Sequence, residues 1–142
     1  MEHFIYDKSG NGLSHEEIKE ELLKSLEGRE LKNVLIIPPD FTRFHSNAGY
    51  ITNVYYHALT EAGVEVDILP ALGTHVPVTE EEVTAMFGDI PFEKFIPHNW
   101  RTDVMKIGEV PAEYLEEITE GLWKDPVSVE INRLVMDEKY DL

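Results

Sequence analysis

The sequence predicts an α/β fold: an open, mostly parallel sheet with flanking helices, followed by a less regular C-terminal third with short strands. Two observations support this prediction. Apolar runs of strand length alternate with helical patterns up to residue 98, as in parallel βαβ units with right-handed crossovers. The chain has 142 residues, 42% of them hydrophobic, which is enough for one domain with a buried core.

A capping box and an apolar stripe predict the first helix. Ser14 followed by Glu17 allows each side chain to satisfy a free backbone donor of the other residue. Leu22 and Leu26 recur at helical spacing, and Gly28 is typical of a C-terminal stop.

The next elements alternate between strand and helix. Residues 34–37 are a continuous apolar run that ends at two prolines, which is typical of a strand buried on both faces. A helix is predicted over 48–62 and a strand over 64–71. A third helix is expected to begin near Thr79, which forms a second capping box with Glu82.

Beyond this point the pattern becomes less regular. Residues 94–97 are expected to form a short third strand, and residues 104–107 and 126–131 are further strand candidates. The charged stretch 113–120 between them is compatible with a helical turn or with an antiparallel excursion. The last three residues could open another strand, and we expect the protein to continue beyond Leu142.

Composition and charge exclude several classes of function. The net charge of −16 argues against binding to nucleic acid or to an anionic membrane surface, because both depend on basic side chains. The absence of cysteine excludes disulfides, thiolate metal sites and a cysteine nucleophile. Neither a signal peptide nor an apolar run of about 20 residues is present, so we expect a cytoplasmic protein.

Three loops are expected to leave the carboxyl ends of parallel strands, where ligands bind in such sheets. The first carries Asp40 and Arg43, whose guanidinium fork suits a carboxylate or a phosphate. The second carries His75, a residue type that exchanges protons near neutral pH. The third carries His98. The alternatives are a surface Asp–Arg pair with a helix cap, and histidines bonded to loop backbone.

Other motifs add little. The histidines at positions 3, 15 and 57 are interpreted as structural, and Trp100 as a packing residue. The sequence contains no HExxH, Walker, GxGxxG or GxSxG motif, and no metal ligand is predicted within the chain.

The loop residues resemble those of the nickel-pincer lactate racemase family. Residues 40–43, Asp-Phe-Thr-Arg, resemble the family's D-x-T-R element, and residues 71–77, Ala-Leu-Gly-Thr-His-Val-Pro, resemble A-L-G-T-H-x-P. Residues 98–99 and 129–133 resemble a later His-Asp/Asn pair and a "v-x-v-N-R" stretch. The resemblance spans roughly residues 31–142.

The resemblance implies an enzyme that inverts a 2-hydroxy acid such as lactate by hydride transfer to a nickel-pincer nucleotide. It implies that His75 is one of two acid/base histidines, that Arg43 binds the substrate carboxylate and that Asp40 lies beside it. Four further positions are expected to contact the cofactor: Thr42, Gly73, Thr74 and His98.

The family's second catalytic histidine, its cofactor-bearing lysine and its nickel-binding histidine lie in a later glycine-rich segment. No such segment occurs before Leu142. Residues 1–142 are therefore expected to be an N-terminal half-site that needs the C-terminal remainder of the protein. Phe44-His45 also stands where the family often has a proline, which affects loop geometry.

Two other functions remain open from the sequence. One is a noncatalytic module that binds a small anion through Arg43 and loop amides. The other is an enzyme for phosphate esters or sugar acids with an unrelated cofactor. A downstream glycine-rich stretch with lysine and histidine would favour the racemase, whereas a natural stop after Leu142 would favour the module.

Overall fold

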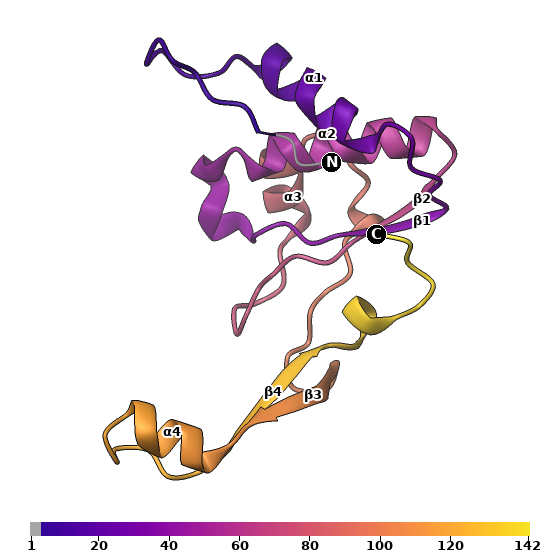
Figure 1. Ribbon diagram of the computed structural model, residues 1–142. Coiled ribbons are helices and arrows are strands. Elements are labelled where there is room, and N and C mark those ends of the chain that lie inside the picture. Colours follow the sequence, from indigo (N-terminus) through magenta and orange to yellow (C-terminus); the bar gives the residue numbers. More distant parts are fainter. Residues whose placement is uncertain (1–3) are drawn as a thin grey trace. The chain divides into compact units, whose positions relative to one another are not determined.

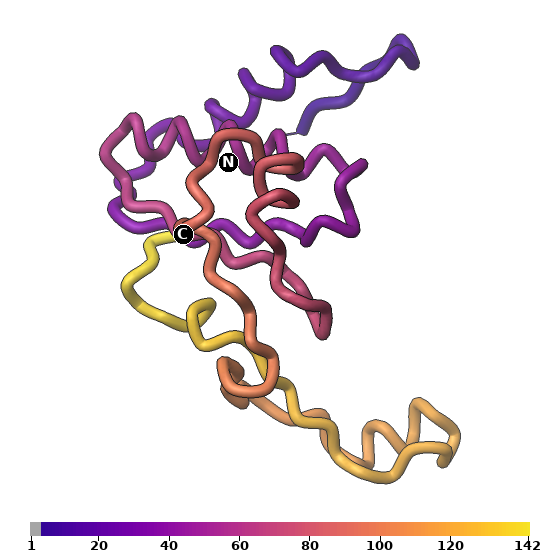
Figure 2. The backbone as a smooth tube through the Cα atoms, turned by 180° about the vertical axis from the view of Figure 1, so that it is seen from behind, coloured from indigo at the N-terminus to yellow at the C-terminus, as the bar shows by residue number. Residues whose placement is uncertain are grey.

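The structure, a computed structural model, describes residues 4–142, which form two compact units (Figure 1). The first unit comprises Met1–Pro97 and Lys139–Leu142, and the second comprises His98–Glu138. The tube in Figure 2 follows the backbone out of the first unit after Pro97 and back into it at Lys139. The second unit is therefore an insertion in the sequence of the first.

The first unit is built on two parallel strands. Strand β1 (Asn33–Ile36) pairs with β2 (Glu65–Ile68), and helix α2 (Ala48–Glu61) is the crossover between them. Helix α1 (His15–Leu26) packs on α2, and Figure 1 shows both helices on the same side of the strands. This small parallel sheet with flanking helices confirms the predicted fold class.

The parallel pairing continues past the ends of both strands. Pro39 and Ala71 form an isolated parallel bridge, and the Ala71 N–H donates to the Pro38 carbonyl at 2.8 Å. The segments that follow β1 and β2 thus leave the sheet side by side at the carboxyl ends of these strands. This bridge fixes the starting points of the two loops that carry Asp40 and His75.

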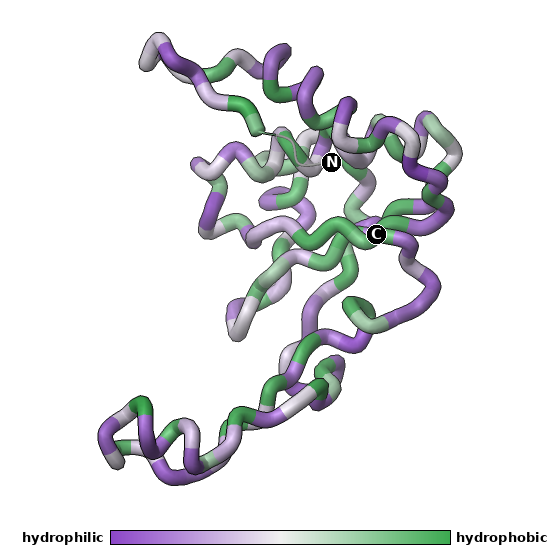
Figure 3. Tube along the Cα trace, in the orientation of Figure 1, coloured by the Kyte–Doolittle hydropathy of each residue, from purple (hydrophilic) through white to green (hydrophobic). Residues whose placement is uncertain are grey.

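The core of the first unit lies between the sheet and the helices. Val66 and Ile68 of β2 are buried against side chains of the helices, including Leu59, Val83 and Phe87. Figure 3 shows the corresponding hydrophobic stretches in green. Removal of this apolar surface from water is the main stabilising contribution to the unit.

The other face of the sheet is partly exposed and carries both apolar and polar side chains, which corrects the expectation that residues 34–37 are buried on both faces. Ile37 is 47% exposed, and Asp67 of β2 accepts hydrogen bonds from Lys139 and Tyr140. Side chains alternate along a strand, so Val34 points into the core. On the opposite face, Asp67 binds the C-terminal tail, residues 139–142.

The tail lies along the outer edge of β1, where the sequence allowed for another strand. The Asp141 N–H donates to the Asn33 carbonyl at 2.8 Å, and the Leu35 N–H donates to the Leu142 carbonyl at 2.9 Å. The Asp141 carboxylate also accepts from the Lys32 and Asn33 amides. These bonds hold the tail on β1 without a regular ladder.

The predicted capping boxes are both present. Ser14 and Glu17 cap α1, and Thr79 and Glu82 cap helix α3 (Glu80–Phe87). The start of α2 differs from a standard cap, because Asn47 has a φ of 64° and makes no capping bond with its side chain. Within residues 4–142, every helix falls short of the length and hydropathy needed to cross a bilayer.

The strand expected at residues 94–97 is reduced to a single bridge, and this prediction is wrong in extent. Phe92–Lys94 form a 3-10 turn, after which Phe95 bridges to Ile68 in parallel. Prolines at positions 91 and 97 bracket this segment, and a proline has no N–H to donate to a ladder.

The second unit is an antiparallel hairpin with a helix at its end. Strand β3 (Val104–Val110) pairs with β4 (Val127–Asn132), and α4 (Ala112–Ile118) lies in the connection between them. A 3-10 turn (Arg133–Met136) follows β4. The two predicted strands are confirmed, and the charged stretch between them contains a helix.

We predict that Gly49→Ala destabilises the first unit. An alanine Cβ at this position in α2 would lie 1.9 Å from the Met86 carbonyl oxygen, so α2 and α3 would have to separate. The expected loss is about 1–3 kcal/mol of unfolding free energy. This steric cost exceeds the gain from the higher helix propensity of alanine relative to glycine. Chemical denaturation measures it. Gly108→Ala is the matched control, because its Cβ would meet nothing within 4 Å; equal stability of the two variants would refute the prediction.

Candidate functional site

Asp40 and His75 meet at the carboxyl edge of the parallel strands. The Asp40 Oδ2 lies 2.6 Å from the His75 Nδ1, although the two residues are 35 positions apart in sequence. Asp40 is 6% exposed, whereas the His75 side chain is 56% exposed. A buried carboxylate therefore anchors an imidazole that is open to solvent. Asp40 is paired with His75 rather than with Arg43, contrary to the alternative of a simple surface ion pair.

Asp40 is held by the loop that it begins. This residue caps a 3-10 turn (Phe41–Ser46), and its Oδ1 accepts hydrogen bonds from the backbone N–H and the hydroxyl of Thr42. The Asp and Thr of the D-x-T-R element thus have a local structural role. They fix the carboxylate so that its second oxygen points at His75.

Asp40 is ionised, as the orientation of the His75 ring requires. Burial raises the pKa of the Asp40 carboxyl, but hydrogen bonds from Thr42 and His75 lower it by more, so the pKa lies below its ordinary value. Asp40 is therefore a carboxylate at neutral pH. An adjacent carboxylate stabilises an imidazole when it takes up a proton.

His75 lies on a turn that is anchored at one end. The His75 N–H donates to the carbonyl of Leu72, which is 2% exposed, at 3.1 Å. Gly73 occupies the turn with a φ of 59°, a conformation that glycine adopts without strain. Because Nδ1 binds the Asp40 carboxylate, the ring nitrogen left to act as a base is Nε2.

Arg43 belongs to the same cluster. Its Nη1 lies 3.4 Å from the Thr42 Oγ1, and its backbone N–H donates to the Asp40 carbonyl at 3.0 Å. The guanidinium is exposed. Contacts therefore run from Arg43 through Thr42 and Asp40 to His75, with a cation at one end and a proton acceptor at the other.

His98 belongs to the second unit and has a different partner. Its Nδ1 lies 2.9 Å from the Asn132 amide nitrogen, and Asn132 is 6% exposed. The Asn132 Oδ1 also accepts from the Leu134 N–H at 2.9 Å. Because Oδ1 accepts from Leu134, the amide nitrogen of Asn132 is left to bind the His98 ring.

Asn132 has a structural role that the sequence analysis did not assign. The motif resemblance marked residues 129–133 without giving Asn132 a contact. Arg133, the next residue, donates from its side chain to the Thr102 carbonyl and from its backbone to Asp103. The Asn-Arg pair thus holds the segment that follows His98.

The structure brings together some of the predicted site residues and assigns others elsewhere. Asp40, Thr42, Arg43 and His75 form one cluster in the first unit, together with the Gly73–Thr74 turn. His98 belongs to the second unit. Within residues 4–142, no group of three or more histidine or carboxylate side chains could hold a metal ion. These residues therefore do not fit a nickel site by themselves.

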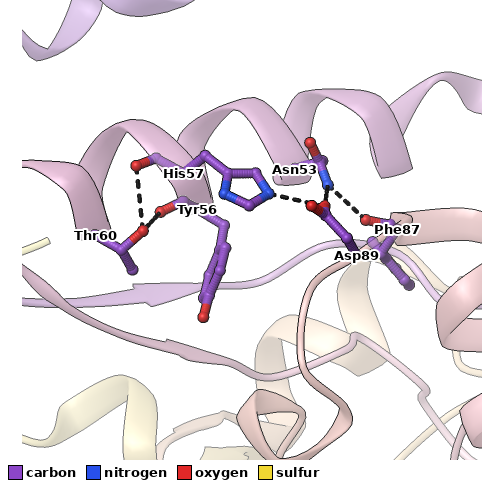
Figure 4. Close-up of polar contacts among 6 residues, drawn as sticks. All are labelled: Asn53, Tyr56, His57, Thr60, Phe87 and Asp89. Atoms are coloured by element: carbon purple, nitrogen blue, oxygen red, sulfur yellow. Dashed lines mark hydrogen bonds and ion pairs between the residues drawn. The ribbon is translucent and has the colours of Figure 1, made fainter.

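Two of the remaining described histidines, His57 and His15, have structural contacts. Figure 4 shows the His57 ring pointing at Asp89, with a distance of 2.8 Å between Nε2 and Oδ1. Asn53 donates to the same carboxylate at 3.0 Å and to the Phe87 carbonyl at 2.8 Å, which joins α2 to the end of α3. The His15 ring stacks on Tyr50. His3 lies outside the described residues.

The chain is thus a small α/β domain with a carboxylate-oriented histidine at the carboxyl edge of its parallel strands, the edge at which open α/β sheets place their ligand sites. More specifically, the chain belongs to the lactate racemase N-terminal domain family, which it matches over residues 13–140. No protein of curated function matches it.

Two solved structures are similar to the chain. A protein from Thermotoga maritima shares 31% identity and a TM-score of 0.79, with 91% of this chain and 32% of that chain covered. The lactate racemase apoprotein from Thermoanaerobacterium thermosaccharolyticum shares 25% identity and a TM-score of 0.59, with 91% and 30% covered. This chain thus spans about a third of the length of these relatives.

We predict that the charge of Asp40 contributes pH-dependent stability. Because the pKa of Asp40 is lowered in the folded protein, the contribution is present above the unfolded-state pKa and is lost as the pH falls through the folded-state value. Asp40→Asn should therefore cost about 1–3 kcal/mol at neutral pH. This difference from the wild type should shrink between about pH 5 and about pH 2. Urea denaturation across this range measures it, and a constant difference would contradict the prediction.

Proposed function

We propose that this chain is part of an isomerase that racemises or epimerises a lactate-like 2-hydroxy acid. The observation that carries the proposal is the 2.6 Å contact between His75 and the buried carboxylate of Asp40 at the sheet edge. Family membership and the similarity to a lactate racemase apoprotein support it. The cytoplasmic location expected from the sequence stays a prediction.

His75 would act as the acid/base group. Its Nε2 takes the proton of the substrate hydroxyl and later returns it. Asp40 holds the ring through Nδ1 and stabilises the imidazolium that forms. Because Asp40 is fixed by its bonds to Thr42, the ring orientation is set before substrate binds.

Arg43 would bind the substrate carboxylate. A chain with a net charge of −16 repels small anions, so a hydroxy-acid site needs a local cation. The exposed guanidinium beside Thr42 supplies this charge in a geometry that suits two parallel hydrogen bonds. A substrate held by Arg43 would have its hydroxyl presented to the same loop cluster.

Inversion of a 2-hydroxy acid also requires an acceptor for the hydride on the substrate carbon. The nickel-pincer nucleotide implied by the sequence resemblance supplies this chemistry when bound. The described residues do not form a metal site, so we assign its attachment and nickel ligation to the remainder of the protein. Thr42, the Gly73–Thr74 turn and His98 are proposed to contact it.

We predict that His75→Gln abolishes racemisation in the full-length, cofactor-loaded protein without unfolding it. Glutamine keeps a hydrogen-bonding side chain but cannot carry a proton at neutral pH. The measurement is conversion of D- or L-lactate, with circular dichroism to verify the fold. His57→Gln is the matched control and should retain activity, because His57 contacts Asp89 in a structural role. Retained activity in His75→Gln would remove the acid/base assignment.

We predict that Arg43→Ala weakens substrate binding by a factor of about 10–150, which corresponds to loss of a charge-assisted pair worth about 1.5–3 kcal/mol. Arg43→Lys keeps the charge but loses the fork, so it should fall between Arg43→Ala and the wild type. KM values or equilibrium binding of the hydroxy acid measure the effect. Unchanged affinity in Arg43→Ala would refute the role. Anion binding without turnover in the loaded wild type would instead favour a noncatalytic module.

A further inference from the structure

The hairpin of the second unit has one apolar face and one polar face. In its antiparallel register, Met105 lies opposite Ile131, Gly108 opposite Val129 and Val110 opposite Val127. Directly paired residues point to the same side of a two-stranded sheet. These six residues, all apolar or glycine, therefore share one face, which we call the apolar hairpin face.

The neighbouring positions carry the polar side. Asn132, Lys106 and Glu130 alternate with the apolar set, as do Glu109 and Ser128. The register shift between Lys106 and Gly108 keeps this alternation in phase on both strands, because it adds one residue to β3. The segregation therefore runs from Met105 to Val110 on β3 and from Val127 to Ile131 on β4, and it ends where Val104 pairs with Asn132 on the polar side.

Within the second unit, no element covers the apolar hairpin face. Met105 is 43% exposed, Val127 is 40% exposed and Val129 is 39% exposed. Figure 1 shows α4 at the end of the hairpin where the strands are joined, and not along its length. Every fully buried hydrophobic residue of the described chain lies between positions 34 and 95, so the second unit has no apolar core of its own.

A two-stranded hairpin without a core is marginally stable in water. A contiguous apolar face on such an element marks a surface that is covered by another part of the assembly. Sequence patterning supports this, since the alternation of apolar and polar residues is typical of a strand with one buried face. The hairpin therefore needs a partner to bury this face.

Charge decides against two kinds of partner. The second unit carries ten acidic and four basic side chains, a net charge of −6. A second copy would bring the same excess of negative charge to the interface, and an anionic membrane would repel it. The net charge therefore favours a neutral or basic partner over a second copy or an anionic membrane.

We propose that the apolar hairpin face docks the remainder of the same protein, the part that lies outside this chain in its threefold longer relatives. This inference rests on the proposed function only in placing the chain in a longer protein. The attachment of this remainder to the same polypeptide raises its effective concentration at the face.

Cysteine labelling tests the proposal, because residues 1–142 contain no cysteine and modification of the introduced thiol is followed on its own hairpin peptide. Val129→Cys places a thiol on the apolar hairpin face, and Ser128→Cys places the matched control on the polar face of the same strand. In the full-length protein, maleimide should modify Val129→Cys at least about tenfold more slowly than Ser128→Cys. In the 142-residue chain alone, the two rates should be similar.

Equal labelling of the two thiols in the full-length protein would overturn the proposal. Protection of Val129→Cys in the 142-residue chain alone would also overturn it, because this chain would then cover the face itself. Protection in the full-length protein that disappears on dilution to monomers would overturn it as well, because a second copy would then be the cover. The readout does not depend on turnover. A full-length protein without racemase activity can therefore still give the expected labelling, and a fully active protein can still refute the docking proposal.

Discussion

The candidate site depends on the parallel pairing of β1 and β2 and on its extension to the Pro39–Ala71 bridge. Parallel strands place their carboxyl ends at one edge, and the bridge keeps the segments that follow them adjacent beyond the regular ladder. Asp40 comes directly after Pro39 of the bridge, and His75 comes four residues after Ala71. Their contact is therefore a consequence of sheet register, because the register fixes where the two loops begin.

Features encoded by neighbouring residues could be predicted from the sequence. The capping boxes at Ser14 and Thr79 each depend on a partner three residues away, and both are present. The strand–helix alternation and the loops at the sheet edge follow from apolar periodicity, which is also local. For the same reason, Asp40, Arg43 and His75 could be selected as site candidates before their geometry was known.

Features that depend on distant contacts could not be predicted. Asp40 binds His75 rather than Arg43 because Thr42 turns the carboxylate toward the second loop, and this arrangement has no signature in the spacing. The amide of Asn132 reaches His98 across 34 positions through the fold of the second unit. Residues 94–97 have strand composition, but the flanking prolines limit their pairing to the bridge at Phe95.

The tail that lies on β1 has a consequence for synthesis on the ribosome. Asp141 caps the amides of Lys32 and Asn33, more than a hundred positions earlier in the chain. A growing polypeptide emerges from its N-terminus, so the outer edge of β1 stays unprotected until the tail has been made. During that interval a nascent chain exposes unpaired amides and carbonyls beside Ile37, a hydrophobic residue that is itself half-exposed. The edge is thus vulnerable to aggregation during translation until residues 139–142 have been made and can pair with it.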